Sequence, residues 1–160
     1  MILITLGSQK FPFDRLLRAV DGLIEEGIIQ EEVYAQSGAS TYQPKHFACK
    51  PFMDREELLA QIDRSSAVIT HGGTGIIVTA IKRGKKVIAV PRLARYGEHV
   101  DDHQIQLIRQ FDEQKLIIPC YELEDLGDKI AQLADFPFQP YRSNTQAILD
   151  DLTNYLQSLM

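Results

Sequence analysis

The sequence predicts an α/β fold: a single doubly wound, Rossmann-like parallel sheet with helices on both faces. Three observations carry this prediction. Short β-branched apolar runs alternate along the chain with segments whose apolar residues recur at helical spacing. The run at residues 87–90 is apolar throughout, which is typical of a strand buried on both faces. The 160 residues match one ordinary domain, so residues 1–160 are expected to form a single unit.

The first half of the chain supplies three expected strands and two expected helices. Residues 2–6 form an apolar run that ends at Gly7, and apolar positions then recur at helical spacing over residues 13–24. Gly27 is expected to close that helix. A strand at 33–36, a polar loop at 39–45, a strand at 46–52 and a short helix at 55–62 follow in order.

The second half continues the alternation. A strand at 67–70 stops at two glycines, and a helix follows to residue 83, with Gly84 as its C-terminal residue. The remaining elements are expected as a strand at 86–90, a charged loop at 92–100, a helix at 101–110, a strand at 116–118 and helices around 123–133 and 148–159. Strands separated by helices imply a parallel sheet covered on both sides.

Composition and charge exclude several classes of protein. A chain that is 44% hydrophobic and 24% charged is neither disordered, collagen-like nor a disulfide scaffold. The formal net charge of -5 gives no basic stripe for nucleic acid. Cys49 and Cys120 form no Cys-x-x-Cys pair, so zinc and redox chemistry are not indicated. No basic leader and no membrane-spanning run is present in the sequence, so a cytoplasmic location is expected.

The strongest functional signal is the glycine loop at residues 70–75, between a buried strand and a helix. Open α/β sheets bind ligands beyond the carboxyl ends of their strands. The glycines allow a close backbone approach, and the helix start offers free N–H groups to a phosphate or diphosphate. Thr74 and His71 add side-chain donors. The alternative is a tight turn without a ligand, and no P-loop lysine follows.

Two other loops carry polar side chains. After the first strand the sequence lacks Gly-x-Gly-x-x-Gly, but Ser8 and Gln9 can donate to an anion. The alternative is a helix cap provided by Ser8 or Asp14. Near residue 100, Asp102, His103 and Gln104 suit a sugar's hydroxyl groups, the alternative being a helix cap. His99 and His103 are four residues apart and could share a helix face. A metal site is nevertheless not favoured, because no remote ligand accompanies these two histidines and no Asp-x-Asp occurs.

Several segments occur in the order and spacing of a known family. They are Gly7-Ser8-Gln9 with residues 11–16, Gln36-Ser37-Gly38 with residues 40–42, the loop at 71–75, and the segments 90–92 and 98–104. The chain resembles the C-terminal, donor-binding half of GT-B glycosyltransferases of family 28 from residue 2 to about 107. It is most similar to bacterial capsule and exopolysaccharide transferases that work as two chains, and to the catalytic subunit of the dolichol-linked N-acetylglucosaminyltransferase.

The resemblance implies roles for individual residues. Ser8 and Gln9 would face the donor diphosphate, residues 71–75 (His71, Gly72, Gly73, Thr74 and Gly75) would cradle it, and Asp102, His103 and Gln104 would contact the donor sugar. Phe52 and Met53 would hold the nucleobase, the alternative being that they cap the core. Thr79 stands where the family often has a glutamate that grips the ribose, and it offers a single hydrogen bond instead.

The resemblance also implies an activity. By this resemblance the chain would be the donor-binding, catalytic subunit of an inverting, metal-independent hexosyltransferase. Such an enzyme moves a sugar from a UDP-sugar to a polyprenyl-diphosphate-linked acceptor in polysaccharide biosynthesis. His71 would stabilise the departing diphosphate, and no general base is assigned, Asp14 being a weak candidate. No cofactor is expected beside the UDP-sugar substrate.

The implied partner is a membrane-anchored, acceptor-binding subunit, which would recruit the chain to the inner face of the membrane. Self-association of the chain alone into a homo-oligomer is left open. Two other functions stay open: a non-catalytic nucleotide-sugar-binding or enhancer subunit, and a nicotinamide or flavin enzyme, against which the missing Gly-x-Gly-x-x-Gly argues.

Overall fold

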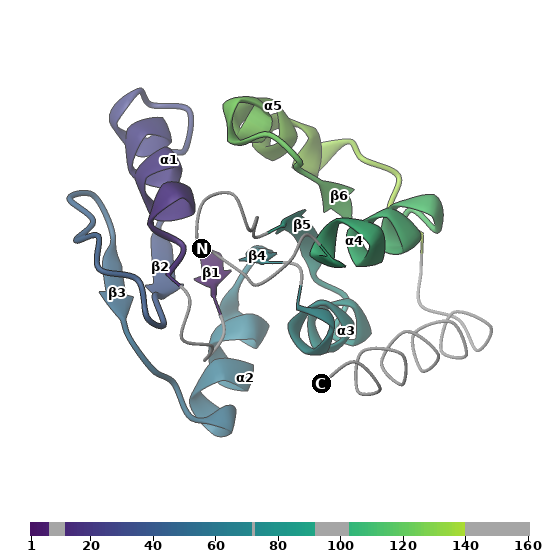
Figure 1. Cartoon of the computed structure of the whole chain (residues 1–160), viewed down its shortest axis with the longest axis horizontal. Coiled ribbons are helices and arrows are strands. Elements are labelled where there is room, and N and C mark those ends of the chain that lie inside the picture. The colour runs from purple at the N-terminus through teal and green to yellow at the C-terminus, as the bar shows by residue number, and fades with distance from the viewer. Residues whose placement is uncertain (7–11, 72, 92–102, 140–160) are drawn as a thin grey trace.

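A six-stranded, all-parallel sheet forms the centre of the molecule, in the order β3-β2-β1-β4-β5-β6 (Figure 1). The computed structural model describes residues 1–6, 12–71, 73–91 and 103–139. The strands are β1 (Ile2–Thr5), β2 (Val33–Gln36), β3 (Ala48–Lys50), β4 (Ala67–His71), β5 (Lys86–Val90) and β6 (Ile118–Pro119). The predicted parallel α/β fold is therefore confirmed.

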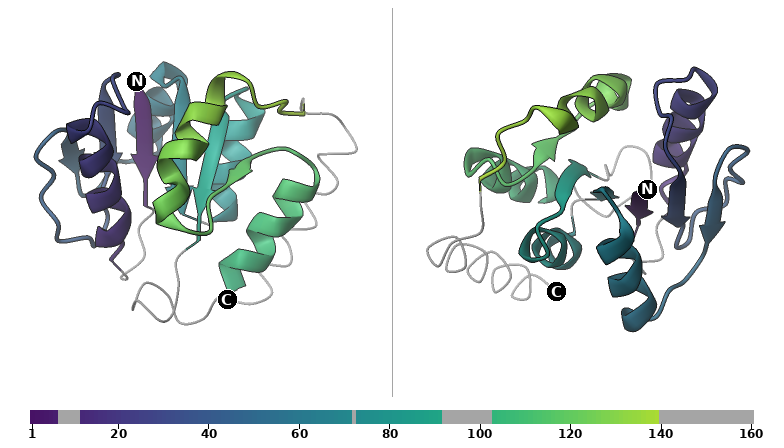
Figure 2. Two further views of the ribbon diagram at one scale, coloured as in Figure 1. Left: turned by 90° about the horizontal axis from the view of Figure 1, so that it is seen from above. Right: turned by 180° about the vertical axis from the view of Figure 1, so that it is seen from behind.

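Helices cover both faces of this sheet. They are α1 (Asp14–Glu25), α2 (Arg55–Arg64), α3 (Thr74–Lys82), α4 (His103–Glu113) and α5 (Leu126–Ala131), with short 3₁₀ turns η2 (Leu123–Asp125) and η3 (Gln132–Ala134) on either side of α5. Figure 1 shows α1 and α5 on one side of the strands and α2 and α3 on the other. In the left view of Figure 2, α1 and α5 lie in front of the strands, which run side by side in the same direction.

Alternating side chains divide the core between the two faces of the sheet. Ile2, Ile4 and Leu6 belong to the cluster that contains the α1 residues Leu16, Leu17 and Val20, while Leu3 and Val68 belong to the opposite cluster with residues of α2, α3 and α4. Phe13 and Phe111 are the largest fully buried side chains, one in each cluster. Because one sheet separates both clusters, the described residues form a single packed unit.

The edges of the sheet differ from the sequence-based prediction. The strand expected at 46–52 is reduced to Ala48–Lys50, which pairs only with β2 and is followed by Pro51, a residue without an N–H donor. The strand expected at 116–118 is displaced to Ile118–Pro119 and ends on a second proline.

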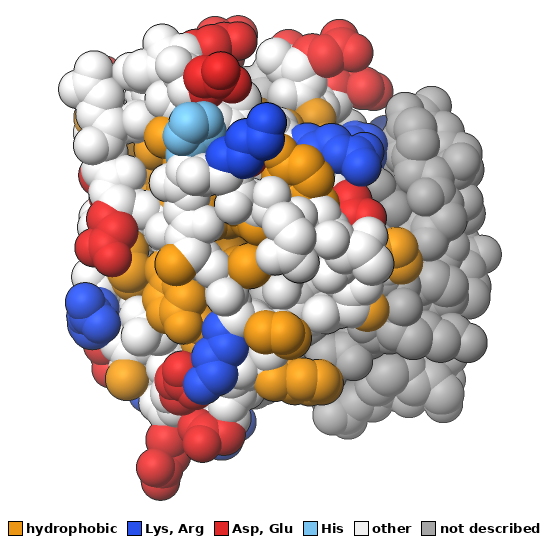
Figure 3. Space-filling model, turned by 90° about the vertical axis from the view of Figure 1, so that its left-hand side faces the viewer, with side chains coloured by type: hydrophobic (Ala, Val, Ile, Leu, Met, Phe, Trp, Pro, Cys, Tyr) orange, Lys and Arg blue, Asp and Glu red, His pale blue; other side chains and the backbone are white. Residues whose placement is uncertain are grey.

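Figure 3 looks onto the side of the molecule that carries α1 and β3, where charged side chains of both signs lie among hydrophobic ones.

Helix boundaries agree more closely with prediction. Gly27 and Gly84 have φ values of +79° and +71°, the left-handed conformation that ends a helix, as predicted for both. The helix expected at 101–110 begins at His103 and runs to Glu113, and the helix around 123–133 is divided into η2, α5 and η3. The loop predicted at 92–100 and the helix at 148–159 lie outside the described residues.

The strand order contains one point at which the direction of winding reverses. From β1 the chain moves outward to β2 and β3, and then returns to place β4 against the other side of β1. The connections that follow β1 and β4 therefore diverge to opposite faces of the sheet. In open α/β sheets such a switch point is where ligands bind.

Candidate functional site

The start of α3 lies at the switch point and lacks a side-chain cap. Gly73 is its N-cap residue, no described side chain accepts a hydrogen bond there, and its first turn contains no acidic residue. By contrast, Asp54 caps α2 by accepting from Glu57 N at 2.8 Å, and two glutamates occupy the first turn of α2. Among the described residues, then, no side chain caps or neutralises the N-terminus of α3, and the positive potential and N–H groups of a helix start favour anions.

An imidazole ring packs against the start of this helix. His71 is the last residue of β4 and is 6% exposed. Its ring occupies the space beside Gly73, where an added Cβ would lie 2.2 Å from His71 Cε1 and 2.8 Å from Nε2. Gly73 has an ordinary φ of -76°, so glycine is required here for space rather than for conformation. His71 and Gly73 thus lie in contact at the start of α3.

Thr79 stands on the same helix, at the position predicted to face a ribose. Its Oγ1 donates a hydrogen bond to the Gly75 carbonyl at 2.7 Å, one turn earlier in α3. The hydroxyl proton is therefore already engaged, and only the oxygen's lone pairs are left for a ligand hydroxyl. A ribose contact at Thr79 would be a single accepted hydrogen bond.

Phe52 and Met53, the predicted nucleobase residues, have different environments. Phe52 is 62% exposed, whereas Met53 is 8% exposed. The Gly38 N–H donates to the Pro51 carbonyl at 3.0 Å, which holds this segment beside the end of β2. Only the aromatic ring of Phe52 is open to stacking, and the side chain of Met53 caps the core.

A row of buried polar side chains crosses the sheet beneath these loops, and the sequence analysis did not identify it. Thr5 Oγ1 donates to Gln36 Oε1 at 2.9 Å, and Thr70 Oγ1 donates to the Thr5 carbonyl at 3.0 Å. All three residues are at most 4% exposed and lie in register on β2, β1 and β4. The row ties together the carboxyl ends of the three strands from which the loops emerge.

Replacing Thr5 by valine is expected to lower the free energy of unfolding by about 1–3 kcal/mol, because it leaves the buried Gln36 Oε1 without its donor. Urea denaturation measures this change. Thr79→Val removes a hydroxyl from an exposed hydrogen bond and is expected to change stability by less than about 0.5 kcal/mol. Equal effects of the two substitutions would contradict a structural role for the buried row.

Two aspartates of α1 fix the connection between β2 and β3. Asp14 Oδ1 accepts from Thr41 N at 2.7 Å and Tyr42 N at 2.9 Å, and its Oδ2 accepts from Thr41 Oγ1 at 3.0 Å. Ser40 Oγ accepts from Phe13 N at 2.8 Å, at the start of α1. The weak candidate for a general base is therefore engaged as an anchor through both of its oxygens.

Asp21, two turns further along α1, is the buried member of this pair. It is 3% exposed and accepts hydrogen bonds from Tyr42 Oη at 2.7 Å and from Lys45 N and His46 N at 2.9 Å. Burial alone would raise the pKa of the Asp21 carboxyl, but these hydrogen bonds, led by that from the Lys45 N–H, hold the pKa below its usual value. Asp21 therefore stays ionised inside the protein.

Comparison with known proteins places the chain in a family. The sequence profile of the glycosyltransferase family 28 C-terminal domain matches residues 1–158. The chain belongs to this family. The resemblance seen in the motifs is confirmed at that level, while the likeness to two-chain transferases stays a prediction. No curated protein sequence matches the chain significantly.

Solved structures of glycosyltransferases share the fold of this family 28 domain. The glycotransferase of kitacinnamycin matches with a TM-score of 0.60 at 14% identity, over 98% of this chain and 38% of that one. MurG of Acinetobacter baumannii matches with a TM-score of 0.57 at 15% identity, over 94% of this chain and 49% of that one. SnogD of Streptomyces nogalater matches with a TM-score of 0.57 at 17% identity, over 94% of this chain and 38% of that one. The chain thus spans less than half the length of each of these proteins.

The remaining predicted residues of the family 28 site are not tested by the structure. Ser8, Gln9, Gly72 and Asp102 lie outside the described residues, as do the side chains of Thr74, His103 and Gln104. The backbone of Thr74 begins α3, and His103 and Gln104 begin α4. Within the described part of the chain, no three potential metal ligands lie together, and no helix is long and apolar enough to cross a bilayer.

Proposed function

We propose that this family 28 domain is the donor-binding and catalytic subunit of an inverting, metal-independent glycosyltransferase. It transfers a sugar from a UDP-sugar to a polyprenyl-diphosphate-linked acceptor in polysaccharide biosynthesis. The observation that carries the proposal is the uncapped start of α3 at the switch point, with the His71 imidazole packed against it. This arrangement suits a diphosphate, because the helix N–H groups and the macrodipole favour negative charge there.

The chemistry requires stabilisation of a leaving group. In an inverting transfer the acceptor oxygen forms a bond to the anomeric carbon while the bond to the UDP oxygen breaks, and that electron pair departs on the diphosphate. The start of α3 and His71 stabilise this growing charge, and the exposed Phe52 ring stacks on the nucleobase. The acceptor proton passes to a base on the acceptor side, since both Asp14 oxygens are engaged.

A second polypeptide completes the proposed enzyme. The support for this proposal is the resemblance of the motifs to those of two-chain transferases, in which a membrane-anchored partner provides the acceptor-binding part. The complex would work at the cytoplasmic face of the membrane, with this chain held there by the partner. In the absence of the partner, we propose, the chain associates with a second copy of itself.

UDP is expected to bind the purified chain in buffer that contains a chelator, and calorimetric titration measures its affinity. His71→Ala is expected to weaken binding by about tenfold or more, because it removes a donor to a charged group. Gly22→Ala is the control, since a Cβ at this α1 position meets no atom within 4 Å. If UDP fails to bind both the chain alone and the chain with its partner, the donor-site proposal is wrong.

The main alternative is a non-catalytic nucleotide-sugar-binding or enhancer subunit. The engaged hydroxyl of Thr79 supports this alternative, because it reduces the grip on a ribose. Sugar transfer measured in the reconstituted complex distinguishes the two functions. Transfer that is lost in His71→Ala supports the catalytic subunit, and transfer that is unchanged supports the alternative.

A further inference from the structure

Gln36, the last residue of β2, has a carboxamide of which only one end is paired. The residue is 4% exposed, and its Oε1 accepts a hydrogen bond from Thr5 Oγ1 at 2.9 Å. Its Nε2 donates to no acceptor in the part of the chain that the structure describes. A nearly buried NH₂ group without an acceptor is unfavourable, and such groups in native proteins call for a specific cause, of which a ligand is one.

The unpaired nitrogen of Gln36 reaches the surface of the protein. Among the described residues, the fully enclosed side-chain atoms that lack a hydrogen-bond partner are Gln61 Oε1 and Tyr121 Oη. Gln36 Nε2 is not one of them, so the small exposed part of Gln36 includes this nitrogen. The hydrogen bond from Thr5 holds the opposite end of the carboxamide within the sheet. Nε2 is therefore a donor that is held in place and open to a ligand.

Gln36 also lies between the two parts of the proposed donor site. In the strand order β3-β2-β1-β4, Phe52 follows β3 and the start of α3 follows β4 (Figure 1). The Ser37 N–H donates to the Lys50 carbonyl at 3.0 Å, and the Leu6 N–H donates to the Gln36 carbonyl at 3.1 Å, so β2 stays paired to both neighbours at this end. Adjacent strands lie about 4.8 Å apart, which places β3 about 14 Å from β4, with β2 between them.

The ribose of a nucleoside diphosphate joins the nucleobase to the diphosphate. With the nucleobase on Phe52 and the diphosphate at the start of α3, the ribose spans the carboxyl end of β2, where Gln36 is the last residue. A sugar hydroxyl both donates and accepts a hydrogen bond, and Thr79 offers it only an acceptor. The NH₂ group of Gln36 supplies the donor that the ribose otherwise lacks.

We propose that Gln36 Nε2 donates a hydrogen bond to a ribose hydroxyl of the bound nucleotide, and that Gln36 thereby contributes to the selection of ribonucleotides. The inference rests on the proposed function, because the place of the ribose follows from the places of the nucleobase and the diphosphate. A nucleotide without ribose hydroxyls gains nothing from this contact, and that difference makes the role of Gln36 measurable.

The probes are UDP and 2′,3′-dideoxy-UDP, which lacks both ribose hydroxyls, titrated calorimetrically into the full chain. Gln36→Met is expected to weaken UDP about three- to tenfold, the effect of one hydrogen bond, and to leave dideoxy-UDP unchanged. Gln61→Met is the matched control, since this α2 residue has an unpaired Oε1 but is no part of the predicted donor site. It should change neither affinity. His71→Ala should weaken both nucleotides equally, because it acts on the diphosphate that they share.

A double variant separates the ribose contact from a structural effect. Gln36→Met alone leaves the Thr5 hydroxyl without its acceptor and lowers stability, whereas Thr5→Val combined with Gln36→Met replaces both partners by apolar groups. The double variant should therefore unfold at a higher urea concentration than Gln36→Met, while its affinity for UDP stays as low. Recovery of UDP binding together with stability would show that Gln36 acts only through the fold, and would overturn the proposal.

The outcomes for UDP distinguish a failure of this inference from a failure of the proposed function. If the natural chain binds UDP but Gln36→Met leaves its affinity unchanged, or weakens UDP and dideoxy-UDP equally, the ribose contact is wrong and the proposed function stands. If UDP binds neither the chain alone nor the chain with its partner, the proposed function is wrong, and the inference is wrong with it.

Discussion

Gly73→Ala is expected to weaken UDP binding at least about tenfold and to lower the free energy of unfolding by about 1–3 kcal/mol. The new Cβ would lie 2.2 Å from His71 Cε1, so the imidazole must leave its place against the start of α3. Calorimetric titration with UDP and urea denaturation measure the two effects. Gly22→Ala, in open space on α1, should leave UDP binding unchanged and increase stability by up to about 1 kcal/mol.

A double-mutant cycle separates steric conflict from other causes. In a His71→Ala background the ring is absent, so adding Gly73→Ala should cost no further stability. Gly75→Ala tests the helix itself, because a Cβ there meets nothing within 4 Å and alanine should stabilise α3 by up to about 1 kcal/mol. If Gly73→Ala lowers the free energy of unfolding equally with and without the His71 imidazole, the contact between the new Cβ and this ring is not the cause of the loss.

Asp21→Asn is expected to lower the free energy of unfolding by about 2–4 kcal/mol. Each Asp21 oxygen accepts from a backbone N–H, Oδ2 from Lys45 and Oδ1 from His46, so either orientation of an asparagine places its NH₂ group against a donor. Asp14→Asn is the matched control. Its NH₂ group can donate to the hydroxyl of Thr41, and we expect a loss of no more than about 1 kcal/mol. Urea denaturation of both variants checks this contrast.

The effect of Asp21 should depend on pH in a defined direction. Because its pKa is lowered in the folded chain, its stabilisation is complete above the pKa of an unfolded aspartate and disappears as the pH falls through the lower, folded value. The difference in unfolding free energy between the natural chain and Asp21→Asn should therefore be constant near pH 7 and shrink below about pH 4. A difference that grows in acid would contradict the assigned ionisation state.

Local sequence patterns were sufficient to predict the central strands of the sheet. Strands β1, β4 and β5 are buried along nearly their whole length, so their apolar runs identify them without knowledge of their neighbours. The glycines Gly27 and Gly84 likewise mark helix ends through their own conformational freedom. The edge strands were misplaced because their length depends on pairing with a single neighbour and on the prolines that end them, Pro51 and Pro119.

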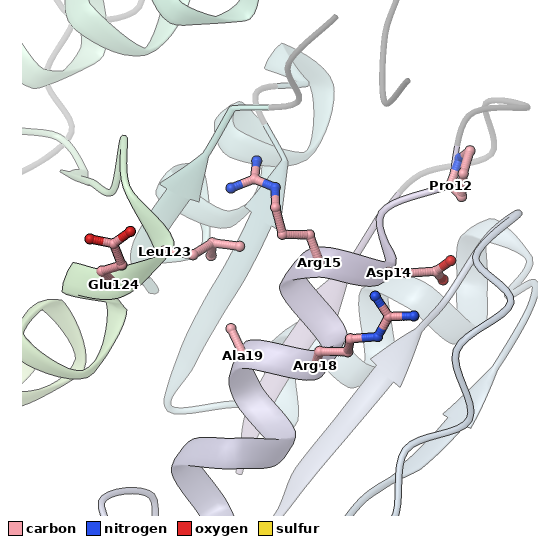
Figure 4. Close-up of a pocket in the computed structure, with 7 residues that line it drawn as sticks. All are labelled: Pro12, Asp14, Arg15, Arg18, Ala19, Leu123 and Glu124. Atoms are coloured by element: carbon pink, nitrogen blue, oxygen red, sulfur yellow. The ribbon is translucent and has the colours of Figure 1, made fainter. Parts of the chain in front are cut away.

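Local sequence patterns likewise predicted one part of the candidate site and missed another. The loop after β4 was predicted because its glycines, strand and helix are adjacent in sequence. Thr5 and Gln36 are 31 residues apart, and Asp21 and His46 are 25 apart, so only the three-dimensional pairing brings them together. A hollow lined by Arg18 and Leu123 combines α1 with η2, which lies about a hundred residues later in the chain (Figure 4). No local pattern in the sequence marks such a combination.

The short outer strands also bear on how the protein behaves at high concentration. An exposed sheet edge is a template on which further chains can add as strands, the first step toward fibrils. Here β3 has three residues and ends on Lys50, and β6 has two and ends on Pro119, which offers no N–H to an incoming strand. We therefore expect the sheet to resist extension at both edges, and association with another chain to proceed through helices or loops.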